Sequence, residues 1–132
     1  MFVVIIGCGR LGSRLAIEAS KGGMNVVVVD KNKRAFDLLT AEFSGFQVVG
    51  DASNQEVLRS AKISDADIVA AVTDNDNVNL MVAQAAKHLF GVGKVLARVT
   101  DPLKAEIYAQ LGLKVLCPAT VAADAIGAEM LK

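Results

Sequence analysis

The sequence is poor in aromatic residues and in the residue types that build metal and redox sites. Its 132 residues include no tryptophan, one tyrosine, one histidine and two cysteines, whereas 53% are hydrophobic. A core of aliphatic side chains is therefore expected, as in a parallel sheet covered by helices. Cys8 and Cys117 lack a C-x-x-C spacing and have no histidine pair beside them, which excludes the common zinc and dithiol motifs. We expect no metal ion.

The chain also lacks an excess of either charge and a long apolar run. Fourteen basic and fourteen acidic residues give a formal net charge of zero, which argues against a nucleic-acid-binding face. No apolar run reaches the ~18 residues of a membrane span, and no secretory signal precedes the first apolar segment. We expect a cytoplasmic protein that neither binds nucleic acid nor inserts directly into a membrane.

Residues 2–30 have the pattern of a dinucleotide-binding unit. The apolar run FVVII precedes GCGRLG, in which Gly7, Gly9 and Gly12 have the G-x-G-x-x-G spacing. Gly7 permits a tight turn, Gly9 lets the backbone approach a pyrophosphate, and Gly12 lets the helix pack closely on the sheet. Asp30 ends the next apolar run, where its carboxylate can accept hydrogen bonds from a ribose. A close-packed turn that binds no ligand would need neither this spacing nor this acid.

Strands and helices alternate along the whole chain. Short apolar runs predict six buried strands, and periodic apolar residues between them predict helices. Six parallel strands joined by right-handed crossovers favour a doubly wound Rossmann sheet of order 3-2-1-4-5-6 in a three-layer αβα fold. We expect one domain over residues 1–132, with strands at 2–6, 24–29, 46–49, 67–73, 94–99 and 114–116.

The helices are each expected to bury an apolar stripe against this sheet. A capping box beginning at Ser53 predicts a short helix to Ser60, and Asp101-Pro102 predicts the start of another. The expected stripes are Leu11, Leu15 and Ala19 in the first helix; Ala35, Leu38 and Leu39 in a helix over 33–43; Val78, Met81, Val82, Ala85 and Leu89 in a helix that ends at Phe90; and Leu103, Ile107 and Leu111 in the next.

In a doubly wound sheet a ligand lies outside the C-terminal strand ends, at the point where the strand order reverses. The expected switch point is between the first and fourth strands, beside loops 7–12 and 73–77. Asp51 and Ala52 follow the third strand and lie further along the same edge. The acidic and amide run at 74–77 lacks the ligand pattern of an EF-hand, so capping of the next helix is the better interpretation than a calcium site.

Six motifs together resemble one known family. They are GCGRLG at 7–12, VVVVD at 26–30, VVGDAS at 48–53, AVTDNDNVNLMVAQAAK at 71–87, LARVTDP at 96–102 and LGLKVLCPATVAADAI at 111–126. With these, the chain is similar to the N-terminal nucleotide-binding domain of potassium-transport regulators, the RCK or KTN domain of TrkA-type proteins. The resemblance implies that it binds NAD(H) or an adenine nucleotide (ATP, ADP or AMP), dimerises, and gates a membrane potassium channel or transporter.

Carried over by position, the resemblance also implies a set of binding residues. The glycine turn would hold phosphates, Asp30 the ribose, and Asp51 and Ala52 the surroundings of the adenine, while Arg10 could pair with a terminal phosphate. The full expected set is Gly7, Cys8, Gly9, Arg10, Leu11, Gly12, Asp30, Lys31, Asp51, Ala52, Thr73, Asp74, Asn77 and Arg98.

Two of these positions leave alternatives open. Lys31 begins a basic group with Lys33 and Arg34 that could hold the 2′-phosphate of NADP, but the carboxylate of Asp30 would repel that phosphate. Arg98 stands in an otherwise apolar strand, so it either has a functional or interface partner or extends its charge from the strand end to solvent.

We expect a regulatory subunit that senses nucleotides rather than an enzyme. The alternative is a small NAD-dependent oxidoreductase domain, but the loops after residues 73 and 99 are short and place no histidine or tyrosine–lysine pair in the crevice. The last helix, about 119–131, has two apolar faces, centred on Ile126 and Ala125. One face can cover the sheet of its own chain, so the other calls for a second partner. The family resemblance implies that this helix crosses onto a neighbouring subunit, so we expect a homodimer or higher homo-oligomer.

Overall fold

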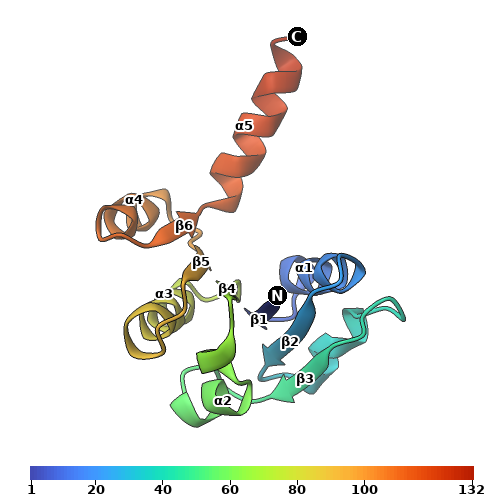
Figure 1. The fold of residues 1–132 in the computed structure, drawn as a ribbon. Coiled ribbons are helices and arrows are strands. Elements are labelled where there is room, and N and C mark those ends of the chain that lie inside the picture. The colour runs from blue at the N-terminus through green and yellow to red at the C-terminus, as the bar shows by residue number, and fades with distance from the viewer.

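The computed structural model describes residues 1–132 and contains one six-stranded parallel sheet (Figure 1). Its strand order is β3-β2-β1-β4-β5-β6, which confirms the predicted topology. Ile6 is level with Val29 of β2 and with Ala71 of β4, so the three central strands end at one edge. The strands are β1 (Phe2–Ile6), β2 (Asn25–Asp30), β3 (Phe46–Val49), β4 (Ile68–Ala71), β5 (Lys94–Arg98) and β6 (Lys114–Leu116).

Helical segments cover both faces of this sheet and give the predicted three layers. The α-helices are α1 (Arg10–Lys21), α2 (Gln55–Ser60), α3 (Asp76–Gln84), α4 (Pro102–Gln110) and α5 (Pro118–Met130). Two 3-10 helices, η1 (Lys33–Leu38) and η2 (Ile63–Asp65), and a π-helical turn, η3 (Ala85–Leu89), complete the set. None of these helices has the length and apolar character that a membrane span requires.

The central strands are buried on both faces because their side chains alternate across the sheet. Val3 and Ile5 pack with Ala16 of α1 and Phe36 of η1 on one face. On the other face Val4 and Ile6 belong to a second core cluster, together with Leu58 of α2 and Val82 of α3. This double burial explains why the strands read as unbroken valine and isoleucine runs.

Two glycines fix the junction between β1 and α1. Gly7 has a φ of +103°, and a Cβ there would stand 2.9 Å from the amide nitrogen of Thr73. A Cβ at Gly12 would collide with the carbonyl oxygen of Gly7. Glycine at both positions therefore lets α1 start against the sheet, beside the loop that follows β4.

Three of the predicted helix boundaries differ from the structure. The expected helix over 33–43 is only the 3-10 helix η1, because Leu39 is extended, with φ −76° and ψ 130°, and ends it. Helix α2 is capped by Asn54, whose side chain accepts from the amide of Glu56 at 2.9 Å, rather than by Ser53. The helix expected to reach Phe90 keeps α-helical geometry only to Gln84 and continues as the π-helical turn.

All four predicted apolar stripes contain residues that are exposed in the structure. In α1 the residues Leu11 and Leu15 are exposed, and the smaller Gly12, Ser13 and Ala16 contact the sheet. Small residues face inward here because α1 lies close to the strands. The remaining stripe residues that are exposed are Leu38 of η1, Met81 of α3, Leu89 of η3, and Leu103, Ile107 and Leu111 in and just after α4.

Helix α5 differs from the others because none of its residues is buried. Figure 1 shows it projecting from the end of β6, away from the sheet, with the C-terminus at its far end. Ile126 is 60% exposed and Met130 is 77% exposed. The apolar faces that the sequence predicts on this helix are therefore open in the single chain.

Candidate functional site

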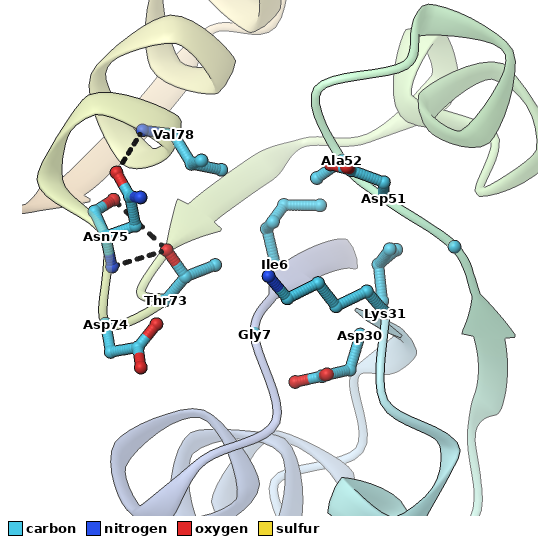
Figure 2. Close-up of a pocket in the computed structure, with 12 residues that line it drawn as sticks. Ile6, Gly7, Asp30, Lys31, Asp51, Ala52, Thr73, Asp74, Asn75 and Val78 are labelled. Carbon is cyan, nitrogen blue, oxygen red and sulfur yellow. Dashed lines mark hydrogen bonds between the residues drawn. The ribbon is translucent and has the colours of Figure 1, made fainter.

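A cavity of about 130 Å³, here called the crevice, lies at the C-terminal edge of the sheet (Figure 2). It is formed by the ends of β1, β2, β3 and the loop after β4, which is the predicted switch point. Figure 2 shows the β2 and β3 ends on one side of it and the loop after β4 on the other. Its lining residues are Ile6, Gly7, Val29, Asp30, Lys31, Gly50, Asp51, Ala52, Thr73, Asp74, Asn75 and Val78.

Asp30 joins the end of β2 to the glycine turn. Its Oδ2 accepts a hydrogen bond from the amide of Cys8 at 2.8 Å, and its Oδ1 accepts from the amide of Asn32 at 2.8 Å. The side chain is only partly buried, and a carboxylate has about four acceptor positions. Asp30 therefore shapes the turn and still has lone pairs to offer a ligand.

Charges of both signs meet in the crevice. The amide and hydroxyl of Ser53 donate to the Asp51 carboxylate at 2.9 and 2.7 Å, and these bonds, assisted by the charge of Lys31, hold the pKa of Asp51 below its usual value. Asp51 is consequently ionised at neutral pH. Figure 2 shows the Lys31 side chain extending across the crevice, from the side of Asp51 toward Thr73.

The loop after β4 is fixed by local hydrogen bonds. Asn75 caps α3, since its side-chain oxygen accepts from the amide of Val78 at 3.1 Å. The hydroxyl of Thr73 accepts from the amide of Asn75 at 3.2 Å. These bonds set the wall of the crevice opposite Asp30.

The N-terminus of α1 opens beside the crevice with its amides free. Gly9 is the N-cap and provides no side-chain cap, and no hydrogen bond occupies the amides of residues 10–12. A Cβ added at Gly9 would meet nothing within 4 Å, so packing within the chain does not require glycine there. Free amides and the helix dipole together favour an anion at this point.

A second cavity, of about 430 Å³, lies on the other side of the glycine turn. Asp74 lines both cavities, so the two adjoin at the loop after β4. Two arginines face this second space, one from α1 and one from β5. Its lining residues are Gly9, Arg10, Leu11, Val72, Asp74, Arg98 and Pro118.

The structure thus divides the residues that the sequence singled out. Seven line the crevice: Gly7, Asp30, Lys31, Asp51, Ala52, Thr73 and Asp74. Gly9, Arg10, Leu11 and Arg98 line the second cavity. Gly12 is buried beneath the turn, and Asn77 is exposed and lines neither space.

Cys8 enters the site through its backbone alone. Its side chain is fully buried, and this burial, with a further effect of the Asp30 charge, raises the pKa of the thiol to about 11. A thiol in this state is neutral at physiological pH and is a poor nucleophile.

Sequence reasoning missed several crevice residues. Asn75 takes the place expected of Asn77. The sequence could have indicated this, because an asparagine three residues before the first apolar residue of a helix is a common N-cap. Ile6, Val29, Gly50 and Val78 also line the crevice. Ile6, Val29 and Gly50 lie at or next to strand ends, and Val78 lies in the first turn of α3, so only the folded sheet brings them together.

The sheet order, the glycine turn and the acid after β2 define a Rossmann-type α/β domain. Within that class the chain belongs to the TrkA-N domain family, whose family model matches residues 3–118. The match covers all six strands, and it confirms the family resemblance of the sequence motifs.

Two relatives show how much of a longer protein this chain represents. It is 40% identical over 124 residues to the Trk system potassium uptake protein TrkA of Streptomyces coelicolor, covering 94% of this chain and 56% of that protein. It is 33% identical over 111 residues to a TrkA homolog of Pyrococcus abyssi, covering 84% and 49%. The chain spans about half the length of the curated relatives it matches.

Solved structures share the fold at lower identity. The TrkA-N domain of the inner membrane protein ybaL from Escherichia coli superposes with a TM-score of 0.85 at 20% identity, over 99% of this chain and 96% of that chain. The Kef C-terminal domain of Shewanella denitrificans, in its AMP-bound form, superposes with a TM-score of 0.80 at 24% identity, over 99% of this chain and 80% of that chain. The GsuK channel bound to NAD superposes with a TM-score of 0.79 at 24% identity, over 96% of this chain and 22% of that chain. At these identities the likeness establishes the fold.

Proposed function

We propose that this chain is the nucleotide-sensing part of a regulatory subunit on the cytoplasmic face of a potassium channel or transporter. The observation that carries the proposal is the uncapped N-terminus of α1, which opens from the glycine turn beside the same crevice as Asp30. The TrkA relatives support the transport role. The neighbours solved with AMP and with NAD support the ligand class.

In this proposal the adenosine half of NAD(H), ATP, ADP or AMP occupies the crevice. The ribose hydroxyls donate to the free lone pairs of Asp30, and the base lies between Asp51, Ala52 and Val78. The phosphates pass over the glycine turn to the free amides of α1, where Gly9 leaves the backbone open to them. NADP fits poorly, because two carboxylates, those of Asp30 and Asp51, share the crevice with a single basic side chain, Lys31, and would repel the 2′-phosphate.

Arg10 is the proposed discriminator between nucleotides. It lines the second cavity rather than the crevice, so only a ligand that extends past the glycine turn reaches it. ATP offers a third phosphate there, whereas AMP ends at the turn. Arg10→Ala should therefore weaken ATP binding much more than AMP binding, and an equal loss for both would remove Arg10 from this role.

We also propose that the regulatory output passes through a homodimer. A groove of about 410 Å³, here called the α5 groove, lies between α1, the strands β4, β5 and β6, and the first turns of α5. All but two of its lining residues are hydrophobic: Leu11, Leu15, Ala70, Val72, Leu96, Ala97, Arg98, Leu116, Pro118, Val121, Ala122 and Ala125. Different nucleotides would shift the population between two packings of a second copy at this groove, with a coupling of about 1–3 kcal/mol.

Titration calorimetry of the purified protein with AMP, ADP, ATP, NAD and NADH tests the proposal directly. We expect saturable binding of at least one of them, and native mass spectrometry should show one nucleotide per chain. Absence of binding for all five at millimolar concentration would overturn it. The oxidoreductase alternative requires sustained, protein-dependent NADH formation with alcohols or hydroxy acids, and we expect none.

A further inference from the structure

Asn79 is the only fully buried polar side chain that joins the ends of two strands at the crevice edge. It is 0% exposed and lies on α3, one turn after the crevice loop. Its Oδ1 accepts from the amide and the hydroxyl of Thr73 at 2.9 and 2.6 Å. Its Nδ2 donates to the carbonyl oxygens of Thr73 and Arg98 at 3.0 and 2.9 Å. The amide thus uses both donors and two acceptor positions, and it lines neither the crevice nor the second cavity.

At one end of this connection Thr73 belongs to the proposed nucleotide site. It lines the crevice, and its backbone packs directly against Gly7, where even a Cβ would not fit. A ligand that presses on the glycine turn or on the loop after β4 therefore acts on Thr73. Three of its polar atoms are bound to one buried amide, so Thr73 cannot move independently of Asn79.

At the other end Arg98 stands at the entrance to the α5 groove. Its side chain lines both the second cavity and the α5 groove, and its Nη1 is 3.4 Å from the carbonyl oxygen of Thr73. Its Nε is buried and has no hydrogen-bond partner. This guanidinium is therefore held in place mainly by the backbone that Asn79 binds, and it is free to gain a partner when that backbone shifts.

A parallel connection runs from α3 to the start of α5. Asp76 accepts from the amides of Thr100 and Asp101 at 2.8 and 3.2 Å. The thiol of Cys117, the N-cap of α5, donates to the carbonyl oxygen of Thr100 at 3.5 Å. The first turn of α3 thus fastens the loop after β4 to the loop after β5, and that loop in turn contacts the base of α5.

We propose that Asn79 is a positioning residue that couples the nucleotide crevice to the α5 groove. A displacement of Thr73 on ligand binding must carry the carbonyl group of Arg98 with it, because separating them would leave buried polar groups without partners. The change then reaches Arg98 and the first turns of α5. This proposal rests on the proposed nucleotide binding, and it adds that the signal leaves the crevice through one buried amide.

Hydrogen exchange with ADP as the probe tests this coupling. In the parent protein, saturating ADP should slow amide exchange about fivefold or more in residues 94–125, as well as around the crevice. Asn79→Ala should still bind ADP, because it does not touch the ligand. Each protein is compared with and without saturating ADP. In Asn79→Ala, ADP should slow amide exchange around residues 7–12 but leave exchange in residues 94–125 unchanged.

Two sets of variants separate coupling from simple stability. Leu80→Ala empties a neighbouring core position on the same helix without touching the network, and it should keep the ADP response of residues 94–125. Thr73→Val removes the hydroxyl that donates a hydrogen bond to Asn79 Oδ1, and Thr73→Ser retains that hydroxyl. The valine variant should therefore weaken the response and the serine variant restore it, even if Asn79→Ala does not fold.

Each outcome separates this proposal from the proposed function. If the parent binds none of the nucleotides in calorimetry, nucleotide binding itself is wrong. If the parent binds ADP but residues 94–125 do not respond, the coupling is wrong and the binding stands. If Leu80→Ala loses the response as fully as Asn79→Ala does, or Thr73→Val responds like the parent, Asn79 is a structural residue only.

Discussion

Asp30 illustrates how one side chain serves the shape of the site and, in our proposal, its ligand. It accepts hydrogen bonds from the amides of Cys8 and Asn32, and it keeps acceptor positions for ribose hydroxyls. Such an acid can be predicted from sequence, because its place at the end of a buried strand is set by the strand pattern alone.

Asp30→Ala should weaken binding of every adenine nucleotide with a free ribose. Each charged hydrogen bond lost is worth about 1.5–3 kcal/mol, so calorimetry should show at least a tenfold loss of affinity. Asp37→Ala is the matched control, since it removes the same charge from an exposed position on η1. Unchanged affinity in Asp30→Ala would mean that the ligand binds elsewhere.

The two thiols should differ in reactivity. The pKa of Cys8 is raised to about 11, chiefly by burial, whereas the backbone and side chain of Thr120 hold the pKa of Cys117 below its usual value. At pH 8 iodoacetamide should therefore modify Cys117 first, as peptide mass spectrometry can show. Preferential modification of Cys8 would contradict this assignment.

The same raised pKa gives Cys8 a pH-dependent effect on stability. Below pH 9 the thiol is protonated in both the folded and the unfolded chain and does not affect the balance between them. Above pH 9 the unfolded chain loses this proton first, so the free energy of unfolding should fall as pH rises toward about 11. Cys8→Ala should reduce that fall in denaturant titrations, and an identical pH profile would contradict the prediction.

Asn79 shows which residues of a site sequence reasoning does not reach. Gly7 and Asp30 belong to a local pattern, whereas the partners of Asn79 come from the ends of β4 and β5 and meet only in the folded sheet. Its one local signal is an asparagine on the buried side of an apolar helix segment. Such a residue must find hydrogen-bond partners, but the sequence does not name them.

At the scale of elements, periodicity predicts that a stripe exists but not which surface it faces. Leu103, Ile107 and Leu111 recur every four residues, yet they are 64%, 48% and 66% exposed. Helix α4 instead contacts the core through Ala105 and Tyr108. The central strands β1, β2 and β4 leave no such ambiguity, because both of their faces are buried. The edge strands β3 and β6 are mostly exposed, and they could be predicted from their short apolar runs alone.

The exposure of α4 and the burial of α3 give a measurable contrast in stability. Leu103→Ser should change the free energy of unfolding by no more than about 0.5 kcal/mol, since the side chain has few contacts to lose. Leu80→Ala should lower it by about 2–5 kcal/mol, because Leu80 is 3% exposed and packs with Val99 and Leu113. Urea titrations of the two variants measure both values, and equal effects would show that α4 is covered in solution.

For the whole molecule, the sheet order followed from the alternation of strands and helices, because crossover connections have one hand. The placement of α5 could not be derived in the same way. It has no buried residue in the single chain, and its apolar residues continue outward from the α5 groove. An apolar helix of 13 residues that stands away from its own sheet is better explained by a second copy than by solvent.

The proposed homodimer should depend on Ile126, which is 60% exposed in the single chain. Ile126→Asp would place a charge in a dry interface, which costs several kcal/mol when the charge has no partner. Sedimentation should therefore show a monomer at concentrations where the parent is a dimer. Because the side chain is exposed in the monomer, the variant should keep a circular dichroism spectrum like that of the parent.

Glu129→Gln provides the matched control on the same helix. It also changes the charge by one unit, but the Glu129 carboxylate pairs only with Lys132, in an exposed ion pair at 3.0 Å, and such pairs contribute little. This variant should remain dimeric. Two results would show that α5 does not form the interface: a parent protein that is monomeric at tens of micromolar, or an Ile126→Asp variant that dimerises like the parent. Nucleotide binding would then have to be coupled to a partner through another surface.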